Sequence, residues 1–258
     1  MAEPPNKVAK LSTDSSSDNS IAFVRDNSTP EHSTTYSEHV SNAGKFLQLN
    51  SLIGHLKHLP RTGWVRAGVT NPEPVAGHMY RMALLAFFMD EPSDAINNGV
   101  TASADKSSTH RFDRDKCIRM ALVHDLAESI VGDITPYCGI SEEDKHSREA
   151  RAIRQIADLI NSNPVVSSSK TKFGDEIVSL WEEYEMGSTP EAQAVRDLDK
   201  FDMIAQAHEY ELQSSSGVQP GDLQSFFNST KGIFQTKQVL KWVEVLMEKR
   251  NEKLTNAD

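Results

Sequence analysis

The chain has 258 residues, of which 38% are hydrophobic and 25% charged, proportions typical of a globular protein with a sizeable core. Its formal net charge is -10 and no basic stripe stands out, which argues against a nucleic-acid polymer as partner because such binding depends on clustered lysine and arginine. No apolar run approaches the roughly 20 residues of a membrane-spanning helix. We therefore expect a soluble protein with neither a membrane nor a nucleic-acid partner.

The first 42 residues are rich in Ser, Thr, Asn and Asp and contain few large apolar side chains. Such a segment cannot bury enough surface to offset the entropy of ordering it, so residues 1–42 are predicted to form a disordered tail before one domain at 43–250. The tail lacks a basic-then-apolar signal, and Cys117 and Cys138 form no disulfide framework. These features favour a reducing, cytoplasmic location, with the nucleus or targeting by the tail as alternatives.

The domain begins with a helical pattern at 44–59, where apolar residues recur at steps of three and four and predict one buried stripe; Pro60 ends this helix. A loop is expected at 61–74. The next segment, 75–89, is apolar nearly all round and predicts a helix central to the core. Residues 91–112 are polar and are expected to form a surface insertion.

A third, mostly apolar helix is expected at 113–130, with Asp113 as its cap. Ser141 opens a charged helix through a capping box, and Thr189 followed by Pro190 marks another helix start. The helices expected after the third lie at 141–160, 175–186, 190–213 and 235–249. Two-residue alternation is missing throughout, so the predicted fold class is all-α, with six or seven helices.

Four polar residues lie within apolar helical segments and are therefore candidates for a shared functional site. They are His78, His124, Asp125 and Asp199. An unpaired carboxylate costs several kcal/mol to bury, so each aspartate needs a cation, a donor network or a metal. Imidazole and carboxylate together suit a divalent metal ion such as Mn, Co, Fe, Ni or Zn. Taken singly, a buried His is more often a hydrogen-bonded core residue and an Asp a helix cap; the predicted convergence of all four in the bundle core favours a shared metal site.

Two further carboxylates follow the His124–Asp125 pair. Glu128 lies four residues after His124, which places it one turn along the same face of the expected helix, and Asp133 lies in the following loop. A carboxylate beside a metal can act as general acid or base. The simpler alternatives are a solvated helix face for Glu128 and a turn residue for Asp133.

Six stretches in order resemble the HD-domain 5'-deoxynucleotidases, and in particular their eukaryotic branch. They are LPRTGWV at 59–65, PEPVAGHMYRM at 72–82, ALVHDLAE at 121–128, IVGDITP at 130–136, LWEEYE at 180–185 and LDK at 198–200. The similarity runs from about residue 45 to 248 and leaves out only the tail and the insertion at 91–112. The resemblance implies an HD-domain helical bundle, a homodimer, and removal of the 5'-phosphate from deoxyribonucleoside monophosphates with one divalent metal ion, Mg included.

The resemblance also assigns roles by position. The implied metal ligands are His78, His124, Asp125 and Asp199. Glu128 would be the catalytic carboxylate and Asp133 an assisting one, while Arg61 would grip the phosphate and Trp64 would line the same pocket. The chemistry of arginine also supports phosphate binding by Arg61, because a guanidinium fork matches phosphate oxygens. The alternative is that Arg61 is a surface residue after a helix.

The chain departs from the family pattern just before the first histidine. Pro74 stands where the family has Ser, and Gly77 replaces the usual polar or acidic residue before His78. If that acidic side chain supports the metal ligands, its loss would weaken metal affinity about 10-fold or more.

Two alternative functions stay open at this point. Other HD enzymes, such as cyclic-nucleotide phosphodiesterases or di-iron oxygenases, generally need extra histidines between the His-Asp pair and the last aspartate, and only His146 lies there. A second metal is therefore not expected. The other alternative is a non-catalytic HD scaffold that binds a nucleotide or a protein partner.

Overall fold

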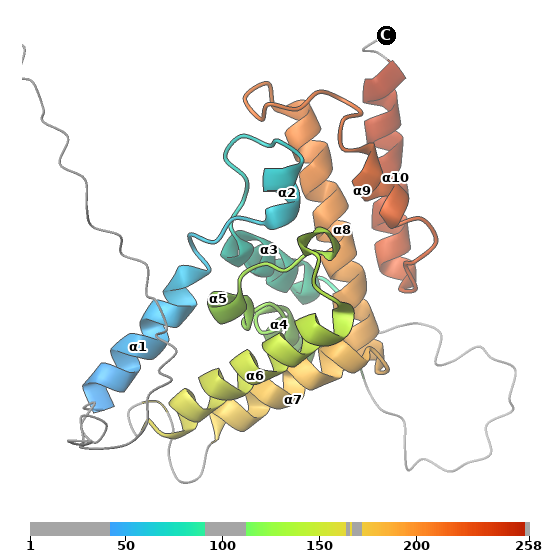
Figure 1. The fold of residues 1–258 in the computed structure, drawn as a ribbon. Helices are drawn as coiled ribbons and strands as arrows, with labels where there is room; N and C mark the ends of the chain where they lie inside the picture. The colour runs from blue at the N-terminus through green and yellow to red at the C-terminus, as the bar shows by residue number, and fades with distance from the viewer. Residues whose placement is uncertain (1–41, 91–111, 164–165, 167–171, 256–258) are drawn as a thin grey trace, which may run out of the picture. The chain divides into compact units, whose positions relative to one another are not determined.

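All regular secondary structure is helical in residues 42–90, 112–163, 166 and 172–255, which the computed structural model describes (Figure 1). The helices are α1 (Asn42–His55), α2 (Thr62–Arg66), α3 (Val75–Phe87), α4 (Arg114–Ala121), α5 (Glu128–Val131), the 3-10 helix η2 (Pro136–Cys138), α6 (Glu142–Asn161), α7 (Phe173–Met186), α8 (Pro190–Leu212), α9 (Gln224–Ser229) and α10 (Lys237–Thr255). The all-α prediction is confirmed. The predicted tail and insertion fall outside the described residues, apart from Asn42 and Phe112 at their edges.

The helix starts follow from local capping. The side chains of Asp113, Ser141 and Thr189 each accept a hydrogen bond from the backbone N–H three residues later, at 2.9, 3.1 and 3.2 Å. Each bond satisfies an N–H that the first turn of a helix leaves without a partner. Pro190 occupies the first turn of α8, where its missing N–H costs nothing. The predicted caps of α4, α6 and α8 are therefore confirmed.

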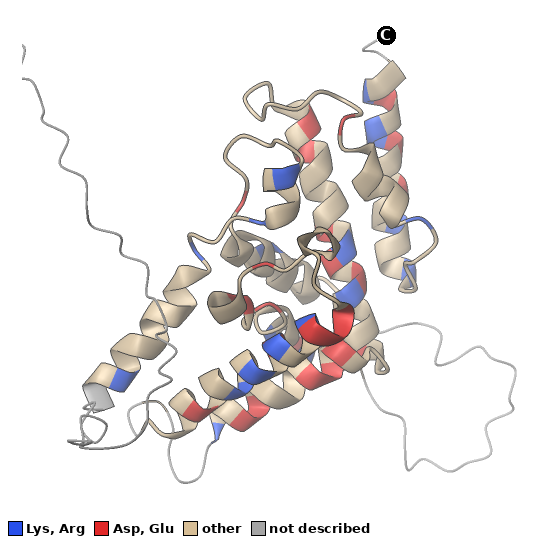
Figure 2. Ribbon diagram, in the orientation of Figure 1, with Lys and Arg blue, Asp and Glu red and all other residues tan. Residues whose placement is uncertain are grey.

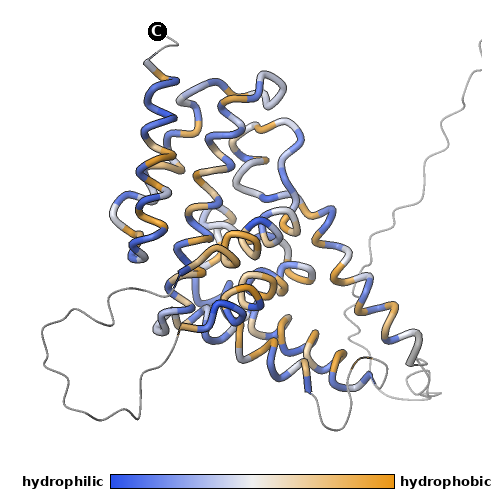
Figure 3. Tube along the Cα trace, turned by 180° about the vertical axis from the view of Figure 1, so that it is seen from behind, coloured by the Kyte–Doolittle hydropathy of each residue, from blue (hydrophilic) through white to orange (hydrophobic). Residues whose placement is uncertain are grey.

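The long helix α8 is the central support of the unit formed by Val40–Asp258, because it packs against α3, α4, α7, α9 and α10. The larger apolar cluster joins α3, α4, α6 and α8 through fully buried side chains that include Met82, Met120, Ile153 and Leu198. Figure 3 shows how strongly apolar residues concentrate in α3. This core positions the polar side chains that α3 and α8 carry inward.

A second apolar cluster packs α2 and α9 against the distal half of α8. Its buried members include Trp64, Ile204, Tyr210 and Phe227. The helices α6 and α7 form a neighbouring pair: α6 has an acidic first turn followed by several Lys and Arg residues, whereas the charged residues of α7 are all Asp or Glu (Figure 2). None of the helices within the described ranges has the length and apolarity needed to span a bilayer.

Three of the sequence expectations for the first half of the chain were wrong in part. The first helix ends at His55, and Phe46 and Ile53 of its predicted stripe are 42% and 48% exposed. Among the described residues, α1 packs mainly on α5 and α6, and the buried leucines here are Leu49 and, just after the helix, Leu56. The expected loop at 61–74 contains α2, and the α3 residues Tyr80 and Phe87 are exposed.

The predicted third helix does not continue through Ile130. It ends at Ala121, and residues 122–127 form tight turns before the short α5 begins at Glu128. Hydrogen bonds in this segment alternate between three and four residues back, as from Val123 N to Met120 O at 3.0 Å and from His124 N to Met120 O at 2.9 Å. His124 and Asp125 therefore lie in a turn between two helices. The short helix α9 was also not predicted.

Candidate metal centre

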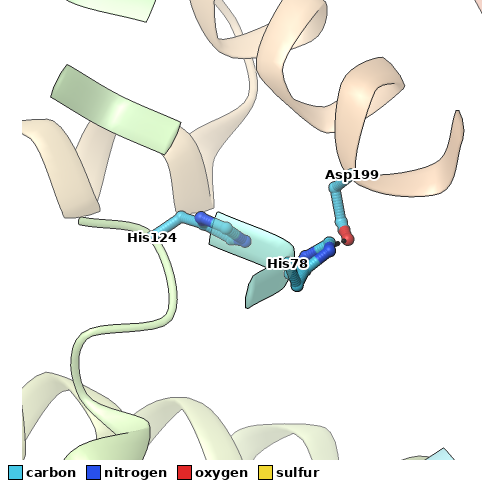
Figure 4. Close-up of side chains that lie close together, drawn as sticks. All are labelled: His78, His124 and Asp199. Carbon is cyan, nitrogen blue, oxygen red and sulfur yellow. Dashed lines mark ion pairs between the residues drawn. The ribbon is translucent and has the colours of Figure 1, made fainter. Parts of the chain in front are cut away.

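Three segments far apart in the sequence bring His78, His124 and Asp199 together (Figure 4). His78 comes from α3, His124 from the turn after α4, and Asp199 from α8; one ligand atom of each lies within 4.8 Å of the others. His78 Nε2 lies 3.3 Å from Asp199 Oδ1, and the two imidazole rings are 5.5 Å apart. All three residues are buried, so the group lies inside the helical bundle.

Asp125 lies at the same place. Its Oδ2 is 3.2 Å from His124 Nε2 and 3.8 Å from His78 Nε2. The structure thus brings together the four residues that sequence reasoning selected, although Asp125 is not one of the three whose ligand atoms are all mutually within 4.8 Å.

The two nitrogens of each imidazole ring differ in their hydrogen bonding. His78 Nε2 and His124 Nε2 are buried and have no hydrogen-bond partner, although leaving such an atom unsatisfied costs about 1–3 kcal/mol. The opposite nitrogens are engaged, since His78 Nδ1 lies 2.6 Å from Asp202 Oδ2 and His124 Nδ1 lies 3.0 Å from Ala121 O. Two free imidazole nitrogens facing carboxylates fit the ligand set of a divalent metal ion.

The carboxylates of the group are held in their charged form. Burial would raise the pKa of Asp199, but Lys200 and His78 keep it well below its usual range. Burial likewise would raise the pKa of Asp125, and His124 lowers it. Both carboxylates are therefore ionised at neutral pH and available to a cation.

Arg61 enters this site from the start of α2. An isolated bridge between Pro60 and Pro74 fixes the segment, with Arg61 N donating to Glu73 O at 3.0 Å. The guanidinium Nη1 is 3.1 Å from Asp125 Oδ2, so this arginine is not the surface residue of the simpler alternative. Burial would lower its pKa, but Asp125 and the neighbouring carboxylates raise it, and the side chain stays cationic.

Glu128 and Asp133 both lie on the wall of the same cleft but differ in their bonding. Glu128 is the first residue of α5 rather than a helical turn beyond His124; it is buried, and its Oε2 has no hydrogen-bond partner. Burial, together with Asp125 and Asp133, raises the pKa of Glu128 well above its usual value. Asp133 Oδ2 accepts a hydrogen bond from Thr62 N at 2.6 Å, which ties its loop to α2.

The cleft beside the metal group has a volume of about 940 Å³. Its wall includes side chains that sequence reasoning did not select, namely Lys145, Glu149, Tyr184, Arg196 and Lys200. Tyr184 donates to Asp199 Oδ2 at 3.1 Å, and Lys200 lies 3.0 Å from the same oxygen. Both could have been found, since Tyr184 lies in the LWEEYE stretch and Lys200 directly follows Asp199.

Trp64 lines the cleft but is only 2% exposed. Its Nε1–H donates to Glu73 Oε1 at 3.1 Å, and its ring packs against Tyr210 and Phe226. These contacts hold the indole in place, and its role in lining the substrate pocket stays a prediction. His146 also lines the cleft, but its Nδ1 lies 2.9 Å from Glu185 and it is outside the metal group.

The glycine before His78 lies in the first turn of α3, where a Cβ would find only ordinary contacts. The nearest atoms are Pro74 Cδ at 3.7 Å and Glu73 Oε2 at 4.0 Å. The His78 ring already has carboxylates at both nitrogens: burial and Arg61 would lower its pKa, but Asp199 and Asp202 raise it to about 9. The chain thus surrounds His78 with negative charge although Gly77 contributes none.

Comparison with known proteins gives relatives along most of the chain. The family model described as HD domain matches residues 53–241. A Xenopus laevis protein named 5'-deoxynucleotidase HDDC2 is 41% identical over 212 residues, covering 82% of this chain and 90% of the relative. The Homo sapiens protein of the same name is 39% identical over 225 residues, covering 87% and 95%. A solved structure of a conserved hypothetical protein from Pyrococcus furiosus has a TM-score of 0.54 and 30% identity, covering 80% and 99%.

Proposed function

This chain belongs to the HD-domain family, and we propose that it is a divalent-metal-dependent 5'-deoxynucleotidase, which hydrolyses deoxyribonucleoside 5'-monophosphates to deoxynucleoside and phosphate. The observation that carries the proposal is the pair of unsatisfied imidazole nitrogens, His78 Nε2 and His124 Nε2, facing ionised carboxylates beside a cleft. Relatives that match this chain over nearly their full length are named for that activity.

The residues proposed to hold the metal are His78, His124, Asp125 and Asp199. A divalent ion held there would supply Lewis acidity for the hydrolysis of the phosphate ester. The residues themselves contribute a preformed geometry, because three of them are buried and their positions are fixed by α3, the turn after α4, and α8.

Arg61 is proposed to bind the phosphate of the substrate. Its guanidinium already lies beside Asp125 and remains charged, so it can turn its remaining N–H donors to phosphate oxygens. These donors would also stabilise the charge that develops on the phosphoryl group as the bond to the 5'-oxygen breaks. Asp133 is proposed to assist by holding Thr62 N, and therefore the start of α2, next to the site.

Glu128 is proposed to be the general acid. Burial and the neighbouring Asp125 and Asp133 raise the pKa of this carboxyl well above its usual value, which favours its protonated form and supports the acid role over the base role. When water attacks phosphorus and the phosphorus–oxygen bond breaks, the departing 5'-oxygen of the deoxyribose needs a proton, and Glu128 would supply it. The proton lost by the water would leave on the phosphate product, and Glu128 would regain its own from solvent in the cleft. Burial and the lack of a partner at Oε2 keep that proton available for the substrate.

The direct test is phosphate release from each deoxyribonucleoside 5'-monophosphate by the purified full chain with Mn, Co, Mg, Fe, Ni or Zn. We expect release that depends on added metal, that disappears with chelator, and that is abolished in His124→Ala. Absence of release with every substrate and metal would instead support the non-catalytic HD scaffold. Cleavage of cyclic nucleotides in place of monophosphates would support the phosphodiesterase alternative.

The homodimer, the cytoplasmic location and the division into a tail and one domain stay predictions. The first is checked by sedimentation equilibrium of the full chain, which should give twice the chain mass of 28.7 kDa. The domain boundary is checked by limited proteolysis, which should remove the first 42 or so residues and leave activity in the remainder.

A further inference from the structure

We propose that Asp202 is the positioning residue for His78: it holds the Nδ1–H of the ring and so presents Nε2 to the metal. Asp202 lies on α8, three residues after Asp199, which places both carboxylates on one face of the helix. The inference rests on the proposed metal site, and it adds a residue that is not itself a ligand.

The geometry assigns the two sides of the ring to different tasks. Asp202 Oδ2 lies 2.6 Å from His78 Nδ1, and both side chains have no exposed surface. An ionised carboxylate only accepts hydrogen bonds, so the hydrogen of this contact belongs to Nδ1. The opposite nitrogen, Nε2, faces Asp199 and Asp125 without a hydrogen bond. The ring is therefore held in the orientation that a metal ligand needs, with the Nδ1 proton engaged by Asp202 and Nε2 turned toward the site.

Asp202 is itself held in place from α3. Arg81, three residues after His78, donates through Nε to the other oxygen, Asp202 Oδ1. The same guanidinium donates to Gln206 Oε1 at 2.9 Å and to both carboxylate oxygens of Glu209, at 2.9 and 2.8 Å. These bonds keep Asp202 ionised and prevent it from rotating away from His78.

The surrounding residues favour Asp202 over other candidates for this role. Glu73 lies close to the same side of His78, but its Oε1 accepts from the Trp64 indole. Gly77 has no side chain to offer. A cation bound among Glu73, His78 and Asp202 would lie against the Arg81 guanidinium, so this second group of possible ligands is better explained as a support for the first.

The test compares Mn²⁺ affinity in two matched variants, measured by equilibrium dialysis of the full chain. Asp202→Asn removes the carboxylate that contacts His78, and we expect the dissociation constant to rise about 10- to 100-fold. Glu209→Gln removes a carboxylate from the far end of Arg81, outside contact with His78, and should change the constant less than twofold. Native affinity in Asp202→Asn, or an equal loss in both variants, would overturn the inference.

A second measurement uses the native Asp202 and tests which nitrogen of His78 carries the proton, even if Asp202→Asn fails to fold. In the native chain loaded with diamagnetic Zn²⁺, nitrogen–proton correlation spectra of His78, assigned with His78→Gln, should show the proton on Nδ1. A proton on Nε2 with Nδ1 bare would refute the proposed tautomer.

His124→Ala separates failure of this inference from failure of the metal site. His124 belongs to the proposed ligand set, and its Nδ1 contacts Ala121 O rather than Asp202; its loss should abolish tight Mn²⁺ binding. If His124→Ala binds Mn²⁺ like the native chain, the metal site itself is wrong. If His124→Ala loses binding while Asp202→Asn keeps it, only the role of Asp202 is wrong.

Discussion

Glu128 and Glu149 both face the cleft, and burial raises the pKa of each, yet their surroundings differ. Glu128 lies among the acidic residues of the site and has a free oxygen. Glu149 lies 3.8 Å from Lys145, an ion pair on α6. The first arrangement suits a proton donor. At Glu149 the effect of burial outweighs the pair with Lys145, so the ionised carboxyl is a cost to folding.

Glu128→Gln should lower kcat for deoxynucleotide hydrolysis about 10²- to 10⁴-fold, because an amide cannot supply the proton that the departing oxygen needs. Mn²⁺ affinity should stay close to native, since Glu128 is not part of the group formed by His78, His124 and Asp199. The measurements are steady-state phosphate release and equilibrium dialysis. Glu142→Gln is the control, because Glu142 is an exposed carboxylate on the same cleft wall; full activity in Glu128→Gln would remove that residue from the mechanism.

Glu149→Gln should make the metal-free chain more stable at pH 8 but leave it unchanged near pH 4. Burial raises the pKa of Glu149 to about 7 in the folded state, above the usual 4.5. The folded state therefore binds the Glu149 proton more tightly than the unfolded state does. The stability that comes from this tighter proton binding is lost as the pH rises through 7. Discounted for screening by Lys145 and by the solvent in the cleft, the gain at pH 8 is about 1–2 kcal/mol.

The check is urea denaturation of both proteins in chelator between pH 4 and pH 8. The difference between native chain and variant should grow between about pH 5 and pH 7 and then level off. A difference that is constant with pH, or a variant less stable at pH 8, would show that the Lys145 pair outweighs the cost of burying Glu149.

At the scale of elements, the turn at 122–127 explains how two adjacent residues reach one site. On a regular helix, side chains of consecutive residues diverge by about 100°, so His124 and Asp125 could not both face the same point. The tightened turn brings Asp125 Oδ2 to 3.2 Å from His124 Nε2. The apolar run ALVHDLA predicts a continuous helix by periodicity, because nothing in the residue types marks this break.

Elements with strong local signals were predictable, and those shaped by tertiary contacts were not. The caps Asp113, Ser141 and Thr189 each indicate a helix start, because each side chain bonds to a backbone N–H only three residues later. Burial of one side of α1, and the position of α9, depend instead on which helices pack against them. Asp202 was missed for the same reason, since its partner His78 is 124 positions away in the chain.

Two glycines at helix starts should respond oppositely to the same substitution. Gly77→Ala should raise the free energy of unfolding by about 0.5–1 kcal/mol, because the added Cβ meets nothing closer than 3.7 Å. Gly174→Ala should lower it by about 1–3 kcal/mol, because a Cβ there would lie 2.4 Å from Ala157 O, where α7 crosses α6. Urea denaturation measures both. Loss of stability in Gly77→Ala would mean that the first turn of α3 needs glycine.

At the scale of the whole molecule, the metal centre is also a structural junction. Its side chains come from α3, from the turn after α4, and from α8, which are the elements that meet in the larger apolar cluster. Without a metal, ionised Asp125 and Asp199 lie close together inside this junction, offset in part by Arg61 and Lys200. The four residues could be predicted from the sequence because each is a polar residue within an apolar helical segment.

A metal that binds the folded chain, and not the unfolded one, must therefore stabilise the entire junction. With Mn²⁺ at about 100 times its dissociation constant, the free energy of unfolding should rise by roughly 2.7 kcal/mol, and Tm by roughly 5–10 °C, relative to protein in chelator. Differential scanning calorimetry measures the shift. In Asp199→Asn the response to Mn²⁺ should disappear and the metal-free Tm should fall, because the interactions with Lys200 and His78 that hold the pKa of this carboxyl below its usual range are weakened. A native chain whose Tm does not change with Mn²⁺ would contradict the proposed metal site.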